Sequence, residues 1–274
     1  MKERNDAEGM MTFGGHLEVL RRMLFRILGV TFAVAVAVFC LKDAAWQLLL
    51  APSESDFSTY TWIERAARGM GAEGFHFRDF HVKLIATNLS SQFMLHLKTS
   101  ICIGLLLASP YILVELFRFV SPALFEKERR YSVKAIVAVY LLFLAGLLVS
   151  YYVLFPISFR FLGTYSVSER VESTITLDSY ISTFLTLSLL MGVVFQLPVV
   201  SFVLGKLGIV DAAMLAKYRK HAFLAILTVA AVITPGQDIL SLALVSLPLY
   251  LLYEASIRVV KRCLGKPGKG PVPA

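Results

Sequence analysis

The sequence predicts an all-α membrane protein with six transmembrane helices and both termini in the cytoplasm. Of the 274 residues, 57% are hydrophobic and only 17% are charged, whereas soluble domains are about 45–50% apolar and about 25% charged. The apolar residues form long uncharged runs. The basic residues are concentrated in every second segment between these runs, which places most of them on one side of the membrane. Residues 1–274 are therefore expected to form one integral membrane domain.

Six uncharged runs can be compared with the thickness of a bilayer, since a spanning helix needs about 20 mostly apolar residues. With charged ends that reach the headgroups, they predict helices at about 23–42, 99–117, 134–155, 179–204, 219–234 and 239–256. The polar residues before the first run predict an anchor rather than a cleaved signal peptide. The last two runs are the weakest, and as a short pair they predict local thinning of the bilayer.

Lysine and arginine indicate the orientation of the chain. The N-terminal segment, the loops 118–134 and 205–221 and the C-terminal tail hold 19 of the 27 basic residues. The remaining 8 lie on the other side, mostly in or beside the long loop 43–98, where charge has little influence on orientation. Basic residues of short loops stay cytoplasmic, so both termini should face the cytoplasm at the bacterial inner membrane. This distribution explains the net charge without a nucleic-acid partner.

Loop 43–98 is the one sizeable segment outside the predicted spans. It contains Pro52, a polar stretch and several glycines, and it is too short and too polar for a separate domain. We expect a periplasmic cap with one or two short helices.

Three prolines lie inside predicted helices, namely Pro110, Pro198 and Pro248. Each removes a backbone hydrogen bond and crowds the carbonyl four residues earlier, so each predicts a bend. Prolines are frequent in membrane helices, and a role in shape alone would explain them. The alternative is that bent helices form a concave wall.

Residue patterns typical of enzymes are missing from the sequence. It contains no nucleophile elbow, zinc-protease motif, phosphate-binding loop or dinucleotide fingerprint. Cys40, Cys102 and Cys263 have neither disulfide nor metal-ligand spacing, and packing as small apolar residues explains them. We therefore expect no catalytic residue, metal or cofactor.

Gln196 is the most polar residue deep within a predicted span, and no charged residue lies near the middle of any span. Its amide could bond a neighbouring backbone, or it could line a cavity. A secondary transporter of a small solute is the alternative function for a polytopic protein, but it would need central charged groups and probably internal repeats. Neither is visible here.

Acidic side chains stand near the predicted cytoplasmic ends of the helices: Glu18, Glu115, Glu126, Glu128 and Glu254. Local ion pairs, worth about 0–1 kcal/mol each when exposed, are the simplest interpretation. The alternative is a site for a cationic peptide, because a carboxylate can bind the planar guanidinium of arginine through two hydrogen bonds, which lysine cannot copy.

Two stretches resemble the TatC family, the polytopic subunit of the twin-arginine (Tat) protein translocase. They are residues 16–22, His-Leu-Glu-Val-Leu-Arg-Arg, and residues 119–130, Phe-Val-Ser-Pro-Ala-Leu-Phe-Glu-Lys-Glu-Arg-Arg. Shorter matches follow in the family's order at 195–198, 234–238 and 252–254. The resemblance covers nearly the whole chain, and residues 119–130 are its specific part.

The resemblance implies a six-helix, cupped membrane protein that binds twin-arginine signal peptides of folded precursors at its cytoplasmic face. It also implies single-span partners of the TatA and TatB type and transport driven by the proton-motive force. Membrane lipid and further copies of the chain are the other expected contacts.

The resemblance also implies roles for individual residues. Glu128 matches the carboxylate that contacts the arginine pair, and the rest of the signal-peptide site would comprise Phe119, Pro122, Glu18, Arg21 and Arg129. Gln196 matches a polar position on the concave face, and Pro52 matches a periplasmic proline. Thr234 and Leu242 match a partner-binding region on the last two helices.

The chain departs from the family pattern in three places. Val19 stands where relatives often have Glu, and the neighbouring Glu18 is rotated by about 100° around a helix, so whether it replaces that carboxylate is open. Leu242 stands where relatives can have a polar residue. Loop 43–98 is longer than is usual in the family.

Overall fold

The computed structural model describes residues 13–69, 84–120, 129–165, 174–234 and 238–264. The long helices are α1 (Phe13–Cys40), α4 (Ser91–Val120), α5 (Arg129–Val149), α7 (Leu177–Val194), α10 (Arg219–Ile233) and α11 (Ile239–Leu264). The short helices are α2 (Lys42–Leu50), α3 (Ser58–Gly69), α6 (Phe155–Thr164), α8 (Leu197–Lys206) and α9 (Ala212–Lys217). Strands β1 (Leu84–Ile85) and β2 (Ile175–Thr176) pair in parallel. The all-α prediction is confirmed, apart from this pair of strands.

Within the residues that the structure describes, five helical stretches are long and apolar enough to cross a membrane. They are Leu17–Cys40, Ser91–Phe119, Ala135–Thr164, Leu177–Lys206 and Ile239–Arg262. These stretches correspond to five of the six predicted spans. The third joins α5 and α6 through a π-helical turn at Ser150–Leu154, and the fourth joins α7 and α8.

The predicted short pair at the C-terminal end of the chain is only half right. Helix α10 has 15 residues and rises about 22 Å, less than the roughly 30 Å of a hydrocarbon core. Helix α11 has 26 residues, because it continues beyond the uncharged run through Glu254 and Arg258. Spanning by α10, and thinning of the bilayer beside it, stay predictions, whereas the expectation that α11 is short is wrong.

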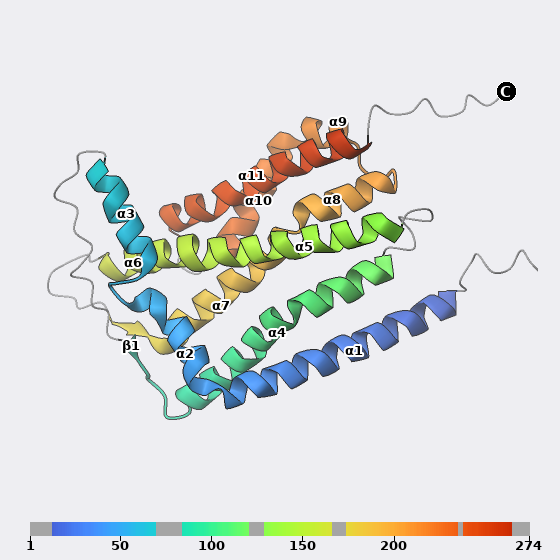
Figure 1. The fold of residues 1–274 in the computed structure, drawn as a ribbon. Coiled ribbons are helices and arrows are strands. Elements are labelled where there is room, and N and C mark those ends of the chain that lie inside the picture. The colour runs from blue at the N-terminus through green and yellow to red at the C-terminus, as the bar shows by residue number, and fades with distance from the viewer. Residues whose placement is uncertain (1–12, 70–83, 121–128, 166–173, 235–237, 265–274) are drawn as a thin grey trace, which may run out of the picture.

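The helices run roughly along one direction and give the molecule two ends (Figure 1). We call the end formed by α2, α3, β1 and β2 the cap end. The other, which we call the terminal end, holds the start of α1, the end of α4, the start of α5, α9 and the end of α11. Of the one or two short helices expected in loop 43–98, the structure has two, α2 and α3.

Two prolines lie directly after breaks in the regular α-helix. The helical path is interrupted at Phe195 and Gln196, and α8 then starts with Pro198 in its first turn. The π-helical turn ends directly before the first turn of α6, which contains Pro156. Pro110 and Pro248 lie inside continuous helices, α4 and α11, so neither one ends its helix.

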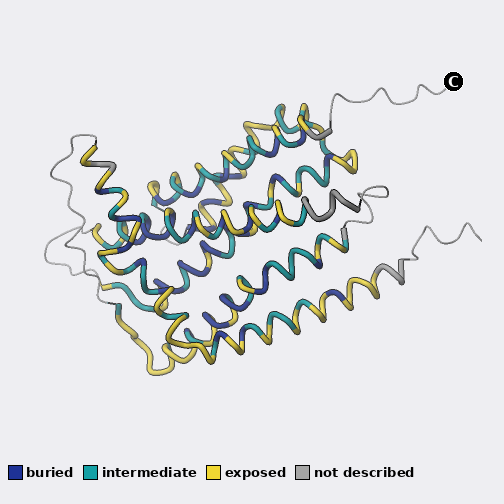
Figure 2. The backbone as a smooth tube through the Cα atoms, in the orientation of Figure 1, coloured by how far each residue is buried: buried dark blue, intermediate teal, exposed yellow. Residues whose placement is uncertain are grey.

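Helix α7 forms the centre of the core, whereas α1 lies at its edge. Buried residues of α7 include Tyr180, Ile181 and Met191, and Figure 2 shows exposed residues along much of α1. Helix α1 packs mainly against α4. The two helices approach so closely that a Cβ atom on Gly104 would lie 2.7 Å from the Cα atom of Ala35.

Candidate functional site

Glu18 lies at the terminal end, on the first turns of α1, and it is already paired within its own helix. Its Oε1 accepts a hydrogen bond of 3.1 Å from Nε of Arg22, and its Oε2 lies 4.0 Å from Nη1 of Arg21. All three side chains are exposed, as is Val19. The carboxylate of Glu18 is therefore partly neutralised by two arginines of the same helix, as expected for a local ion pair.

The end of α4 brings Phe119 to the same end of the molecule, with its side chain half-buried. One turn earlier, Glu115 is buried, and its Oε1 lies 3.8 Å from Nη1 of the exposed Arg118. Glu128 and Pro122 lie outside the described residues. Arg129 is the first residue of α5, and its side chain too lies outside the described part. Glu18, Phe119 and Arg129 thus come from three helices whose ends share one side of the molecule.

Among the described acidic residues of the terminal end, Glu254 has the shortest ion pair. Its Oε1 lies 2.7 Å from Nε of Arg219, and its Oε2 accepts a 3.1 Å hydrogen bond from Nη2 of the same guanidinium. Beside it, the Tyr253 hydroxyl donates to the Leu215 carbonyl at 2.7 Å. These contacts fasten α9 and the start of α10 to α11, which gives Glu254 a structural role.

Gln196 lies at the break between α7 and α8, half-buried against α5. Its Nε2 donates to the carbonyl oxygen of Val139 at 3.1 Å, which is the backbone contact considered from the sequence. Its Oε1 is buried and has no hydrogen-bond partner among the described residues. The side chain therefore joins two helices and retains one unused acceptor.

Thr234 and Leu242 lie at the cap end, where α10 ends and α11 begins. Thr234 is buried, and its hydroxyl donates to the Ala230 carbonyl at 3.0 Å; Leu242 is half-buried and packs on the core. Thr234 also lines a cavity of about 170 Å³ between α6, α7, α10 and α11. Two further lining residues, Ser158 and Ser241, have buried hydroxyls without a partner among the described residues, so this region has a polar interior.

Pro52 is buried at the cap end, in the turn between α2 and α3. The hydroxyl of Tyr60 donates to the Pro52 carbonyl at 2.9 Å and lies 3.3 Å from the Pro156 carbonyl. Burial raises the pKa of Tyr60 to about 12, although the Arg160 guanidinium opposes the shift. Pro52 therefore belongs to a joint that fixes the cap to α6.

Two more tyrosines strengthen this joint. Tyr151 donates to the Leu48 carbonyl at 2.9 Å, and Tyr180 donates to the Leu49 carbonyl at 2.8 Å. The hydroxyl of Thr59 donates to the Tyr152 carbonyl at 2.5 Å. In an α-helix, the Tyr152 carbonyl would accept a hydrogen bond from the N–H group of residue 156. That residue is Pro156, which has no N–H group, so the carbonyl is available to Thr59.

A family model described as Sec-independent protein translocase protein (TatC) matches residues 15–248. The chain belongs to the TatC family. Among curated TatC proteins, that of Blattabacterium sp. subsp. Periplaneta americana is 32% identical over 252 residues, which cover 91% of this chain and 94% of the relative. TatCy of Bacillus subtilis is 41% identical over 186 residues, 68% of this chain and 73% of the relative.

The fold is that of TatC as well. A crystal structure of the twin arginine translocase receptor TatC matches with a TM-score of 0.74 at 27% identity, covering 91% of this chain and all of the other. A second crystal structure of the same receptor, in DDM, matches with a TM-score of 0.73 at 28% identity. The chain is therefore a component of a protein translocase, and this result favours the translocase prediction over a small-solute transporter.

Sequence reasoning missed the partners of several residues that it had selected. It named Glu254 without Arg219, and Pro52 without Tyr60. Charge alone could have suggested the first pair, since Arg219 begins the helix that precedes α11. No signal in the sequence identifies the second, because its acceptor is a backbone carbonyl.

Proposed function

We propose that this TatC chain binds twin-arginine signal peptides of folded precursor proteins at its terminal end, facing the cytoplasm of the bacterial inner membrane. The supporting observation is the combination of family membership with the residue order of the 119–130 stretch, which includes the acidic segment between α4 and α5. A carboxylate there can accept two parallel hydrogen bonds from a guanidinium group, each worth about 1.5–3 kcal/mol. This geometry would favour an arginine pair over a lysine pair.

Within this site, we assign the arginine pair to Glu128. Glu18 is the weaker candidate, because Arg21 and Arg22 already offset its charge. Phe119 and Pro122 would supply apolar contact beside the pair, and Arg129 would border it. The apolar part of a signal peptide could then lie along the bundle, away from the headgroups.

Orientation of the terminal end toward the cytoplasm rests on charge. The segments at this end hold 19 of the 27 lysines and arginines. Basic residues next to spanning helices remain on the cytoplasmic side during insertion. A reporter domain fused to the C-terminus should therefore be active only if it works in the cytoplasm.

Single-span TatA- and TatB-type proteins are the partners that we assign to this chain, with Thr234 and Leu242 in the contact region. Two observations support this assignment. A cavity lined by hydroxyl groups lies beside Thr234, and helix α10 is shorter than the other long helices. No charged residue lies near the middle of any of the six predicted spans. We therefore place coupling to the proton-motive force in these partners or in movement of the peptide.

Peptide capture with a matched pair of ligands tests the receptor function. The full chain, purified in detergent, is mixed with a photo-crosslinkable signal peptide that carries Arg-Arg, and in parallel with its Lys-Lys version. We expect crosslinking only to the Arg-Arg peptide. Glu128→Gln should reduce it at least tenfold, because the charged acceptor is lost, while membrane insertion stays normal.

Glu18→Gln is the matched control, since it makes the same chemical change on a carboxylate that is already ion-paired. It should lower crosslinking less than threefold. Equal capture of both peptides by the unmodified chain, or full capture by the Glu128→Gln variant, would contradict the proposal.

A further inference from the structure

A second cavity lies at the cap end, far from the proposed signal-peptide site. Its volume is about 560 Å³. It opens between α2 and α4 and is lined by Lys42, Trp46, Leu50, Leu89, Gln92, Phe93, His96 and Leu177. This lining combines hydrogen-bond donors with apolar side chains and contains no carboxylate.

The helical spacing of the lining residues explains this composition. Lys42, Trp46 and Leu50 follow each other at intervals of four on α2, so they share one face of the helix. Gln92 and His96 are likewise four residues apart on α4. Asp43 is rotated by about 100° from Lys42 and lines an adjoining hollow with Glu54, and the two hollows share Trp46 and Leu50. Lys42 therefore lines the cavity, whereas the nearest carboxylates, Asp43 and Glu54, line the adjoining hollow.

Two ring nitrogens beside the cavity lack a hydrogen-bond partner. Nε1 of Trp46 and Nε2 of His96 are both buried, and neither has a partner among the described residues. The His96 ring is held by stacking on Phe39, with ring centroids 4.2 Å apart and an interplanar angle of 14°. An unsatisfied buried donor costs roughly 1–3 kcal/mol, and protein atoms cover both ring nitrogens, so these two rings form the floor beside the cavity rather than its accessible lining.

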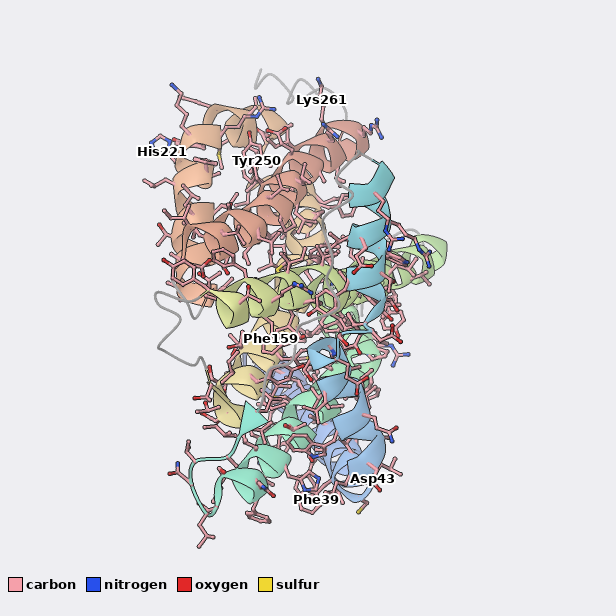
Figure 3. All side chains as sticks on the ribbon, turned by 90° about the vertical axis from the view of Figure 1, so that its left-hand side faces the viewer. Phe39, Asp43, Phe159, His221, Tyr250 and Lys261 are labelled. Atoms are coloured by element: carbon pink, nitrogen blue, oxygen red, sulfur yellow. The ribbon has the colours of Figure 1, made fainter. Side chains whose placement is uncertain are left out.

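The cavity lies where the long helices end. α1 ends at Cys40 and α4 begins at Ser91, and Figure 3 shows Phe39 and Asp43 at this edge of the molecule. The exposed side chain of Phe93 lies within the apolar stretch that starts at Ser91 and would face lipid, whereas the exposed Leu89 precedes this stretch. Polar side chains thus stand beside an exposed aromatic side chain near the ends of two spanning helices, where a headgroup and an acyl chain would meet.

We propose that this cavity binds one phospholipid, with its phosphodiester held by the exposed side chains of Lys42 and Gln92 beside the rings of Trp46 and His96. The phosphate offers only acceptors, which complements the ammonium group of Lys42 and the amide N–H₂ group of Gln92. The acyl chains lie against Phe93. The proposal does not depend on signal-peptide binding at the opposite end.

Tryptophan fluorescence tests this site locally. The chain has two tryptophans, and Trp62 is exposed on α3, so the full-length Trp62→Phe variant reports on Trp46 alone. The protein in detergent micelles is titrated with phosphatidylglycerol whose acyl chains carry bromine, which quenches nearby indoles. We expect saturable quenching, with half-saturation shifted at least fivefold upward by Lys42→Gln or by Gln92→Leu.

Controls separate the phosphodiester from other causes. Lys217→Gln removes the same charge at the terminal end and should leave the titration unchanged. Brominated diacylglycerol, which lacks the phosphate, should quench weakly and without saturation, and millimolar inorganic phosphate should not displace the lipid. Equal quenching by diacylglycerol would overturn the proposal, and so would displacement by inorganic phosphate, which would indicate a site for a free anion. Unchanged half-saturation in both variants would overturn it as well.

Discussion

Nε of Arg219 lies 2.7 Å from Oε1 of Glu254, and a second hydrogen bond of 3.1 Å makes the pair bidentate. The pair connects the start of α10 with α11 across 35 residues of sequence. Glu254 is about one-fifth exposed and Arg219 about half exposed, so solvent screens the attraction. The ion pair therefore contributes only modestly to the stability of the contact between α10 and α11.

Breaking this tie should destabilise the protein by about 1 kcal/mol. Glu254→Gln and Arg219→Gln are each expected to lower stability, and the double variant should lose less than the sum, because both changes remove the same contact. Unfolding of the detergent-solubilised chain measures all three. Arg258→Gln, one turn along α11, is the control and should stay within about 0.5 kcal/mol of the unmodified protein; strict additivity of the pair would contradict the coupling.

Tyr60→Phe should weaken the joint between the cap and α6. The variant keeps the ring but loses the hydroxyl that serves the carbonyls of Pro52 and Pro156. Loss of a buried hydrogen bond costs about 1–2 kcal/mol. Hydrogen exchange should rise in residues 51–69 and remain unchanged in α11; unchanged exchange in the cap would show that the hydroxyl is not needed there.

The same tyrosine predicts a pH dependence at high pH. Burial raises the pKa of Tyr60 from 10.0 to about 12. The folded state therefore keeps the proton over a range in which the unfolded state loses it. This contribution to stability is complete below pH 10 and is lost as the pH rises toward 12. The midpoint of thermal unfolding should fall across this range more steeply for the unmodified chain than for Tyr60→Phe, and parallel curves would contradict the assignment.

Gly104→Ala should loosen the packing of α1 against α4. The added methyl group would lie 2.7 Å from the Cα atom of Ala35, so the helices must separate, at a cost of about 1–3 kcal/mol. Gly29→Ala is the matched control, because no atom lies within 4 Å of the Cβ position there. It should be neutral or stabilising by up to about 1 kcal/mol. Both changes are measured by unfolding in detergent, and equal effects would show that the close approach is unimportant.

Local sequence was sufficient for the helices but not for the contacts between them. Uncharged runs predicted five stretches that the structure has, and Pro198 predicted the break before α8. The length of α11 was missed because charges were taken as its end, whereas Glu254 is paired with Arg219 and Arg258 lies on an exposed face. Strands β1 and β2 have only two residues each. Such short strands show no alternating pattern in the sequence, so they could not be predicted.

The candidate site was predictable only in part. The family motif selected Glu18, but its ion pairs with Arg21 and Arg22 are what make it a weak site residue. The residues that line the proposed lipid cavity are spaced by four on α2 and on α4, which the sequence shows. Only the structure shows that α2 packs beside α4, so that these residues line one cavity.

The joint at the cap end has an unequal tolerance to mutation. Its donors are hydroxyl groups of tyrosines and of Thr59, whereas its acceptors are main-chain carbonyls, among them those of Leu48, Leu49 and Pro52. Any residue type carries such a carbonyl, so the exposed Leu48 can change without loss of a bond. The residues that supply the carbonyls can therefore vary in evolution, whereas the residues that supply the hydroxyls must keep them.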